Sequence, residues 1–243
     1  MRYQGGKTII APAISQKILK IMNEKNIKPD ILVSLFCGAC SVETRLADHF
    51  DKVICNDSHK YLIALLKAVQ EGYQLPEYIS EQQYKYIRDN KDWDKVLTGF
   101  AGFGCSFGGK FFGGYARNRT NRNYAMESKK SLMRDKKHWN NIDFICRDYK
   151  DVKLPDRCVI YADPPYNNTT GYKTRFNSDE FWDYAREISK NHLMFISEQN
   201  APKDFMSIWE RKKTRTIDNN KRNQPVIKEN LFVHKAHFIY EVN

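Results

Sequence analysis

Four consecutive residues carry the clearest chemical potential in this sequence: Asp163, Pro164, Pro165 and Tyr166. They end the apolar run CVIYA, which begins at Cys158. Proline has no N–H to donate to a neighbouring strand, and an unpaired carboxylate is costly to bury, so the chain is expected to leave the sheet here. A carboxylate at the end of a buried strand is well placed to bind a polar ligand group. The alternative is a strand-ending turn with a capped acid.

Three further positions carry glycine or polar side chains where apolar runs end: the turn at 36–41 (FCGACS), Asn56 with Asp57, and Asp148. In a doubly wound fold all of them would lie on the same edge of the sheet as Asp163. A glycine-bearing turn permits close approach of a ligand, and an acid after the second strand can accept hydrogen bonds from ribose hydroxyls. Together they suggest a cofactor that contains a nucleoside. Asp57 is equally well explained as the N-cap of the next helix.

Helices and strands alternate along the chain, which would bring these positions together. Apolar periodicity predicts helices over 11–24, 59–69 and about 179–189. Short apolar runs predict strands over 31–36, 52–56, about 141–146, 158–162 and 193–197, and a final alternating strand over 232–242. Nearly continuous apolar strands between helices indicate an α/β fold with a mostly parallel, doubly wound sheet.

Residues 72–140 differ in composition from the rest of the chain. The stretch FAGFGCSFGGKFFGGYARNRTNRNY within them is aromatic, glycine-rich and basic. A structureless loop of this length would be unusual inside a compact domain, so an inserted lobe with its own structure is expected. The predicted core domain therefore consists of residues 1–71 and 141–243.

The positive charge is concentrated in two segments. Residues 107–137 contain nine Lys or Arg and two acids, and residues 211–228 contain seven and one, in a chain of net charge +11. The rest is close to neutral, which is typical of a soluble core with two basic surfaces and favours a polyanionic partner. The second segment could be a phosphate-contacting loop or a solvated hairpin.

Several motifs occur in the order used by the Dam-like, D12-class DNA adenine-N6 methyltransferases, an alpha-type group. RYQGGK near the N-terminus, LFCGACSVE, CND, a long insert and DPPY resemble this family over nearly the whole chain. The resemblance implies the Rossmann-like fold of S-adenosylmethionine-dependent methyltransferases, with the insert as a target-recognition lobe. It also implies transfer of methyl from S-adenosyl-L-methionine to N6 of an adenine flipped out of double-stranded DNA.

The resemblance assigns roles to individual residues. The expected cofactor-binding residues are Tyr3, Lys7, Phe36, Gly38, Asp57, Asp148, Tyr149 and Asp163. The expected catalytic residues are Asp163, Pro164, Pro165 and Tyr166. At the cofactor turn the family usually shows Phe-x-Gly-x-Gly, whereas this chain has Cys40 at the second glycine, and a side chain there is expected to crowd the methionine portion.

The residue types of DPPY suit methylation of an exocyclic amine. Such an amine is a poor nucleophile because its lone pair is delocalised into the ring. The Asp163 carboxylate and the Pro164 carbonyl could accept its two N–H groups and stabilise the developing charge. Tyr166 could stack on the extruded base, which offsets part of the cost of unstacking it. By resemblance, DPPY favours adenine over cytosine-N4 as the target.

Arginines and asparagines alternate next to two tyrosines in the insert. These types suit phosphates, base edges and stacking, and the expected DNA-binding residues are Arg117, Arg119, Arg122, Tyr115 and Asn121. An RNA adenine-N6 enzyme, a DNA cytosine-N4 enzyme and a catalytically weak nucleic-acid-binding module of the same fold stay open as alternatives.

Two other motifs suggest different chemistry. CGAC at 37–40 has the spacing of a redox motif, although its neighbours fit a cofactor turn better. GGKT at 5–8 lacks the glycine and the strand that precede a phosphate-binding loop. Scattered cysteines offer no metal-ligand spacing, so no metal is expected.

Length and composition limit the remaining possibilities. A chain of 243 residues can bury one substantial core, and its six unevenly spaced cysteines indicate reduced thiols. No apolar run approaches the roughly 20 residues that span a bilayer, and a membrane partner is not expected. We expect a cytoplasmic protein of bacterial or phage origin, by resemblance, which acts as a monomer or as a dimer on DNA.

Overall fold

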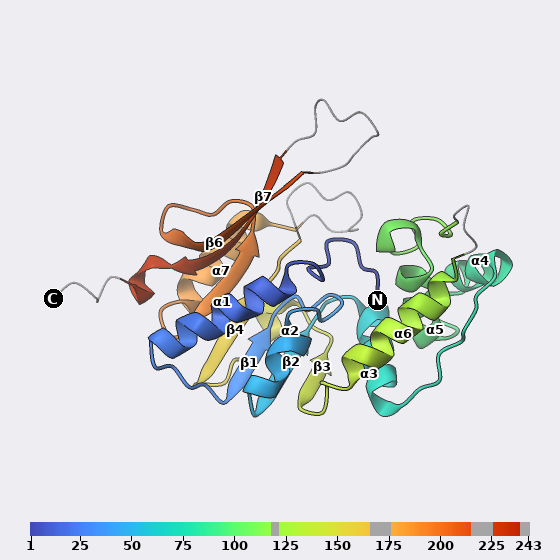
Figure 1. Cartoon of the computed structure of the whole chain (residues 1–243), viewed down its shortest axis with the longest axis horizontal. Coiled ribbons are helices and arrows are strands. Elements are labelled where there is room, and N and C mark those ends of the chain that lie inside the picture. Colours follow the sequence, from blue (N-terminus) through green and yellow to red (C-terminus); the bar gives the residue numbers. More distant parts are fainter. Residues whose placement is uncertain (118–121, 166–175, 215–225, 239–243) are drawn as a thin grey trace.

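The computed structural model describes residues 1–117, 122–165, 176–214 and 226–238. Within these residues the strands form one seven-stranded sheet in the order β3-β2-β1-β4-β5-β7-β6 (Figure 1). The strands are β1 (Ile31–Ser34), β2 (Lys52–Asn56), β3 (Ile142–Ile145), β4 (Cys158–Ala162), β5 (Met194–Glu198), β6 (Phe205–Thr214) and β7 (Val226–His234). Strands β1 to β5 run parallel, and β7 is antiparallel to β5 and β6. The predicted mostly parallel, doubly wound sheet is confirmed.

The central strands are apolar because both faces of the sheet are covered. In β1, Leu32 packs into the core on one face and Val33 into the core on the other, and both are fully buried. The strand ends at Ser34, two residues earlier than predicted, although the N–H of Leu35 still donates to the carbonyl of Tyr161 on β4 at 3.0 Å. Parallel strands buried on both faces read as continuous apolar runs.

Helices cover both faces of the sheet. The core on one face includes residues of α1 (Ala11–Glu24), α2 (Glu43–Leu46) and α3 (Lys60–Glu71), and the core on the other face includes α7 (Ser178–Ile188). In α1, the fully buried Ile14 and Ile18 are four residues apart and so lie on one side of the helix. Gly72 ends α3 with a φ of 100°, a left-handed conformation that glycine adopts without strain.

The chain between α3 and β3 forms the helical end of the molecule, at the right of Figure 1. It contains α4 (Glu81–Asp89), α5 (Lys95–Gly99), a π-helical turn at Phe100–Gly104 and α6 (Tyr124–Lys136). Helix α5 packs closely on α3, because a Cβ at Gly99 would lie 2.2 Å from the carbonyl oxygen of Tyr61. The backbone N–H of Gln4 donates to the carbonyl of Gly109 at 3.1 Å, so this end also contacts the N-terminal segment.

Strands β6 and β7 form a hairpin at one edge of the sheet. The sequence pattern did not predict β6. The final strand predicted over 232–242 is placed too late: residues 232–234 belong to β7, which covers Val226–His234, a 3-10 turn follows at Lys235–His237, and residues 239–242 lie outside the described residues. The basic segment therefore contains the ends of two paired strands. Charged side chains are common on edge strands, where they hinder pairing with other chains, and they mask the strand pattern in the sequence.

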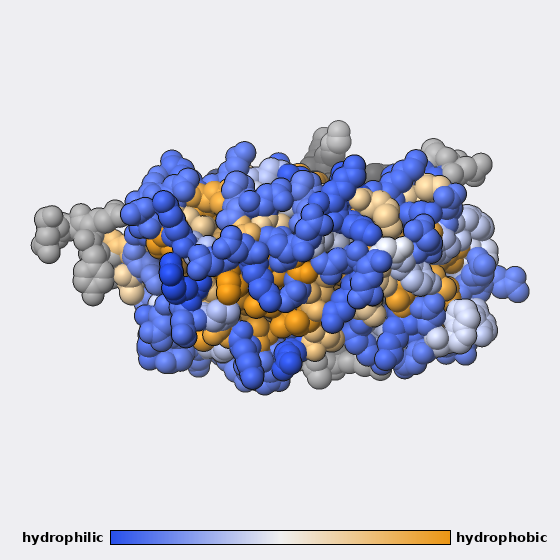
Figure 2. Space-filling model, turned by 90° about the horizontal axis from the view of Figure 1, so that it is seen from below, coloured by the Kyte–Doolittle hydropathy of each residue, from blue (hydrophilic) through white to orange (hydrophobic). Residues whose placement is uncertain are grey.

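Hydrophilic residues dominate the surface seen from below in Figure 2, and hydrophobic residues show between them toward the middle. No helix in the described ranges is both long and apolar enough to cross a bilayer.

Candidate active site

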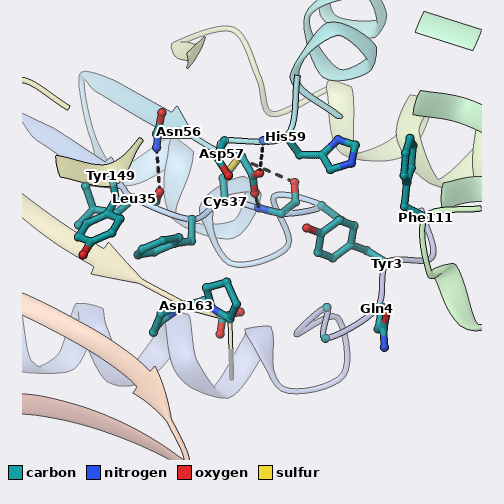
Figure 3. A pocket seen from close by; sticks show the side chains of 18 of the residues that line it. Tyr3, Gln4, Leu35, Cys37, Asn56, Asp57, His59, Phe111, Tyr149 and Asp163 are labelled. Atoms are coloured by element: carbon teal, nitrogen blue, oxygen red, sulfur yellow. Dashed lines mark hydrogen bonds between the residues drawn. The ribbon is translucent and has the colours of Figure 1, made fainter. Parts of the chain in front are cut away.

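A cavity of about 1000 Å³ opens at the carboxyl ends of the parallel strands. Its wall combines the N-terminal segment, the turns after β1 to β4 and part of the chain before α6. All four positions predicted for one edge of the sheet line this cavity: Phe36 to Gly38, Asp57, Asp148, and Asp163 with its two prolines. Tyr149 lies at one end, Tyr3 and Phe111 lie at the other, and Asp57 and Asp163 lie between them (Figure 3).

Asp57 joins the turn after β1 to the turn after β2. Its Oδ2 accepts the N–H of Gly38 at 3.0 Å, and its Oδ1 accepts the N–H of His59 at 2.8 Å (Figure 3). The N-cap of α3 is His59, whose Nδ1 accepts the N–H of Leu62, so the alternative that Asp57 is the N-cap is wrong. Burial raises the pKa of Asp57, and the two donated hydrogen bonds oppose this rise.

Gly38 and Tyr3 meet at the cavity wall. Gly38 has a φ of 48°, and a Cβ on it would lie 2.9 Å from Cε1 of Tyr3. The turn needs glycine both for its backbone conformation and for the close approach of the tyrosine ring. Tyr3 and Gly38, which are both predicted to bind the cofactor, therefore lie side by side.

Cys40 does not obstruct the cavity. In the described part of the chain the wall includes Ala39 and Ser41 but not Cys40, whose Sγ lies 3.5 Å from Sγ of Cys55 in the core. The expectation that its side chain crowds the cofactor site is therefore wrong. Burial raises the pKa of Cys37 to about 12 and also raises the pKa of Cys40. Thiols that stay protonated are poor nucleophiles, which disfavours a redox role for CGAC.

Aromatic rings form one end of the cavity wall. The rings of Phe36 and Tyr149 are 5.1 Å apart, and Phe181 of α7 packs against both. Asp148 directly precedes Tyr149 and has an exposed carboxylate, whose Oδ1 accepts the N–H of Lys150 at 3.0 Å. An apolar ring surface next to a carboxylate can hold a planar base attached to a hydroxylated sugar.

Asp163 lies at the end of β4 and pairs with Lys7 from the N-terminal segment. The Nζ of Lys7 is 2.9 Å from Oδ1 of Asp163 and 2.9 Å from Oε1 of Glu229 on β7. The Lys7 side chain is only 5% exposed, so its ammonium lies between two carboxylates. Burial raises the pKa of Asp163 to about 6, while the Lys7 charge opposes this and the Glu229 charge adds to it.

Two further carboxyl groups lie close enough to interact electrostatically with Asp163. Glu43 begins α2, and its Oε1 accepts the hydroxyl of Ser34 at 2.6 Å. Burial raises the pKa of Glu43 to about 7 and the pKa of Glu198, at the end of β5, to about 7. Asp163 thus interacts electrostatically with three other carboxyl groups, those of Glu43, Glu198 and Glu229, and two of these, Glu43 and Glu198, are partly protonated near neutral pH.

Rings from the helical end form the other end of the wall. The His59 ring centroid is 4.4 Å from that of Phe111 and 4.8 Å from that of Phe103, and Tyr3 lies 5.1 Å from Phe103. Burial lowers the pKa of His59 to about 4, so this histidine is neutral at pH 7. Sequence analysis missed His59 and both phenylalanines, because their contact depends on how the insert folds back onto α3.

The predicted DNA-binding residues are only partly within the described structure. Arg117 is exposed and pairs with Glu81, and Arg122 donates to Glu127 at 2.8 and 2.7 Å. The hydroxyl of Tyr115 donates to the carbonyl of Ile79 at 2.7 Å, which fixes this ring within the helical end. Arg119, Asn121 and the predicted catalytic residue Tyr166 lie outside the described residues.

The part of the chain that the structure describes contains no group of three or more His, Cys, Asp or Glu that could hold a metal ion. All six cysteines are free.

The fold and the cavity define the class of protein. A mostly parallel, seven-stranded sheet over the described residues, with the cavity at its carboxyl edge, is the Rossmann-like fold of S-adenosylmethionine-dependent methyltransferases. The family model described as D12 class N6 adenine-specific DNA methyltransferase matches residues 3–95 and 97–223. The chain belongs to this family, as the resemblance of its motifs implies.

Solved methyltransferase structures align with most of the chain at low identity. A putative RNA methyltransferase, PH1948, from Pyrococcus horikoshii aligns with 8% identity and a TM-score of 0.42, over 91% of this chain and 83% of its own. The tRNA (m1A58) methyltransferase TrmI from Aquifex aeolicus aligns with 11% identity and a TM-score of 0.40, over 96% and 72%. The putative methyltransferase yhhF from Escherichia coli aligns with 8% identity and a TM-score of 0.37, over 91% and 86%. Such low sequence identities and TM-scores do not indicate which substrate this protein uses.

Proposed function

We propose that this protein transfers a methyl group from S-adenosyl-L-methionine to N6 of an adenine that is flipped out of double-stranded DNA. One observation carries the proposal: the Asp163 carboxylate, at the end of β4 and directly before two prolines, lines the same cavity as the glycine turn at Gly38. An amine acceptor and a nucleoside-binding turn therefore face one space. The family assignment makes adenine in DNA the substrate to test first.

The residues of the cavity fit S-adenosylmethionine. The left-handed Gly38 lets the Tyr3 ring pack closely against the turn after β1 at the cavity wall. Phe36 and Tyr149 offer an apolar wall for the adenine ring, with the exposed Asp148 next to it. The Asp57 carboxylate already accepts two backbone N–H groups, and carboxylate oxygens have further lone pairs for ribose hydroxyls. The Lys7 ammonium is held by two carboxylates, so in this proposal Lys7 acts mainly on Asp163.

The chain contributes hydrogen-bond acceptors and positioning to the reaction. When bound, S-adenosylmethionine supplies a methyl group on a positively charged sulfur. The Asp163 carboxylate and the Pro164 carbonyl accept the two N–H groups of the target amine, which favours a pyramidal nitrogen with an available lone pair. Asp163 is mostly ionised at pH 7 because its pKa is raised only to about 6. Proline removes the backbone donors that would compete for these acceptors.

The helical end, residues 72–140, is proposed as an inserted target-recognition lobe on a core of residues 1–71 and 141–243. It supplies Phe103 and Phe111 to the cavity wall and places Arg117 and Arg122 on its surface. Exposed ion pairs contribute little to stability, so phosphates can replace Glu81 and Glu127 as partners of these arginines. Arg119, Asn121 and Tyr115 stay proposed contacts of this lobe. The Tyr166 ring is proposed to stack on the flipped base.

The test is incubation of the purified protein with isotope-labelled S-adenosylmethionine and either DNA or RNA, followed by nucleoside mass spectrometry. Labelled N6-methyladenine from DNA supports the proposal. Label on cytosine or only in RNA supports one of the other methyltransferase assignments. Absence of labelled nucleosides, together with no cofactor binding by calorimetry in the presence of DNA, supports a binding module without turnover.

A further inference from the structure

Glu229 occupies a position that the sequence motifs do not explain. It lies on β7, and its Oε1 is 2.9 Å from Nζ of Lys7, the same distance that separates Nζ from Oδ1 of Asp163. The hydroxyl of Ser197 on β5 donates to Oε1 of Glu229 at 3.2 Å. The glutamate is only 15% exposed, so it pairs with Lys7 largely shielded from solvent, behind the residues that line the cavity.

The three charged groups come from segments that are far apart in the sequence. Lys7 belongs to the N-terminal segment, Asp163 follows β4, and Glu229 is held beside β5 by the antiparallel pairing of β5 with β7. Because the Lys7 ammonium pairs with both carboxylates, neither carboxylate forms an exclusive ion pair with it. The charges of the trio sum to −1 when all three groups are ionised.

Sharing the ammonium affects how well Asp163 can accept a hydrogen bond or a proton. A lysine paired with Asp163 alone would stabilise the ionised carboxylate most strongly and would make it a weaker acceptor. The Lys7 charge lowers the pKa of Asp163 and the Glu229 charge raises it, so the two neighbours act in opposite directions. Glu229 therefore limits how far Lys7 can weaken the acceptor.

We propose that Glu229 is a positioning residue for the amine methylation, which anchors the Lys7 ammonium from β7 and so keeps Asp163 an effective acceptor at the cavity. This inference rests on the proposed function. Glu229 acts through Lys7 and Asp163, and it need not touch either substrate. It also gives the β6–β7 hairpin a role at the site, in addition to completing the sheet.

Other titratable groups face Asp163 and affect any measurement that depends on pH. They are Lys7 from the N-terminal segment, Glu43 of α2, Tyr161 of β4, Glu198 of β5 and Glu229 of β7. Burial raises the pKa of Glu43 and of Glu198 to about 7 each. A variant at Glu229 must therefore be compared with the wild-type protein over the whole range from pH 4 to 9.

The central experiment compares Glu229→Gln with the wild-type protein. The rate of the single-turnover reaction at saturating DNA and cofactor is expected to fall by about tenfold or more, as for other losses of positioning at a reacting centre. The acid limb of its pH profile is expected to move to lower pH, because the Glu229 charge that raises the pKa of Asp163 is then absent. Lys7→Met is expected to move this limb to higher pH. If Glu229 had a purely structural role, Glu229→Gln would slow the reaction without shifting the acid limb of the pH profile.

Two variants serve as controls. Glu210→Gln removes a glutamate from the same hairpin, where it pairs with the exposed Lys228 at 3.2 Å, and it should leave the rate and the pH profile unchanged. Glu229→Asp keeps the charge and should retain the wild-type position of the acid limb. If Glu229→Gln does not fold, the Glu229→Asp variant tests the proposal instead. A large loss of rate in Glu229→Asp, together with a shift of the acid limb of its pH profile to lower pH, would contradict the proposal.

A second readout separates this inference from the proposed function. The Asp163 carboxyl can be titrated by ¹³C NMR without any substrate, with Asp163→Asn to identify its signal. A lower pKa of Asp163 in Glu229→Gln than in the wild-type protein supports the inference even if no DNA is methylated. An unchanged pKa overturns it even if the wild-type protein methylates DNA, and wild-type activity alone decides the proposed function.

Discussion

Replacing Asp163 by asparagine removes one charge at the proposed reacting centre while nearly preserving the shape of the side chain. In Asp163→Asn the Lys7 ammonium still pairs with Glu229 at 2.9 Å, and the charge of the trio changes from −1 to 0. The Lys7 ammonium therefore keeps a carboxylate partner, so the variant is expected to fold and to bind DNA. The loss should therefore fall on the chemical step.

The magnitude follows from the role of Asp163 as an acceptor for a developing positive charge. Removal of one such preorganised group typically costs about 10²- to 10³-fold in rate, which corresponds to roughly 2.7–4 kcal/mol. Single-turnover methylation at saturating DNA and cofactor measures this directly, and DNA affinity by fluorescence anisotropy serves as the control. A variant that methylates within threefold of the wild-type rate would refute the assigned role.

The pH dependence gives the same prediction a second check. The wild-type rate should fall as the pH drops through about 6, because protonation removes the acceptor charge of Asp163. The residual activity of Asp163→Asn should lack this decrease. Changes near pH 7 from Glu43 and Glu198 should appear in both proteins, because these groups remain. An identical fall below pH 6 in both proteins would show that another group titrates there.

Three further predictions concern the cofactor turn, the packing of the helical end and DNA binding. Gly38→Ala should weaken cofactor binding measured by calorimetry and cost about 1–2 kcal/mol of stability, because the new Cβ meets Tyr3 at 2.9 Å and the φ of 48° is strained for alanine. Cofactor affinity equal to wild type would contradict this account of the turn. Gly99→Ala should lower stability by about 1–3 kcal/mol in urea unfolding, because its Cβ would lie 2.2 Å from the Tyr61 carbonyl oxygen; an unchanged midpoint would show that α5 can shift freely. Replacing Arg117, Arg119 and Arg122 together by alanine should make the plot of log DNA affinity against log salt concentration less steep. The slope should fall in magnitude by up to about 0.9 for each phosphate that the protein no longer neutralises. Arg45→Ala on α2 should leave the slope unchanged, and an unchanged slope in the triple variant would exclude the three arginines from the interface.

Local patterns were enough to predict the sheet and most of the cavity wall. The apolar runs before Phe36, Asp57 and Asp163 show where buried strands end, and parallel topology brings the ends of these strands to one edge. Family motifs placed Tyr3 and Lys7 at the same edge. These features depend on a few neighbouring residues or on a topology rule, so they can be read from the sequence.

Features that depend on distant contacts were missed or misread. Glu229 lies in a strand that sequence analysis began at residue 232, and its partner Lys7 is more than 200 residues away in the chain. The charged side chains of β6 concealed that strand. Cys40 was expected at the cavity because of its position in a motif, but a φ of 59° turns its thiol toward Cys55 in the core.

The most direct test of the central claim is nucleoside mass spectrometry after reaction of wild-type and Asp163→Asn protein with labelled S-adenosylmethionine and unmethylated double-stranded DNA. We predict labelled N6-methyladenine from the wild-type reaction and at least a hundredfold less from the variant in the same time. Label on cytosine, label found only when RNA replaces DNA, or equal labelling by both proteins would contradict the account.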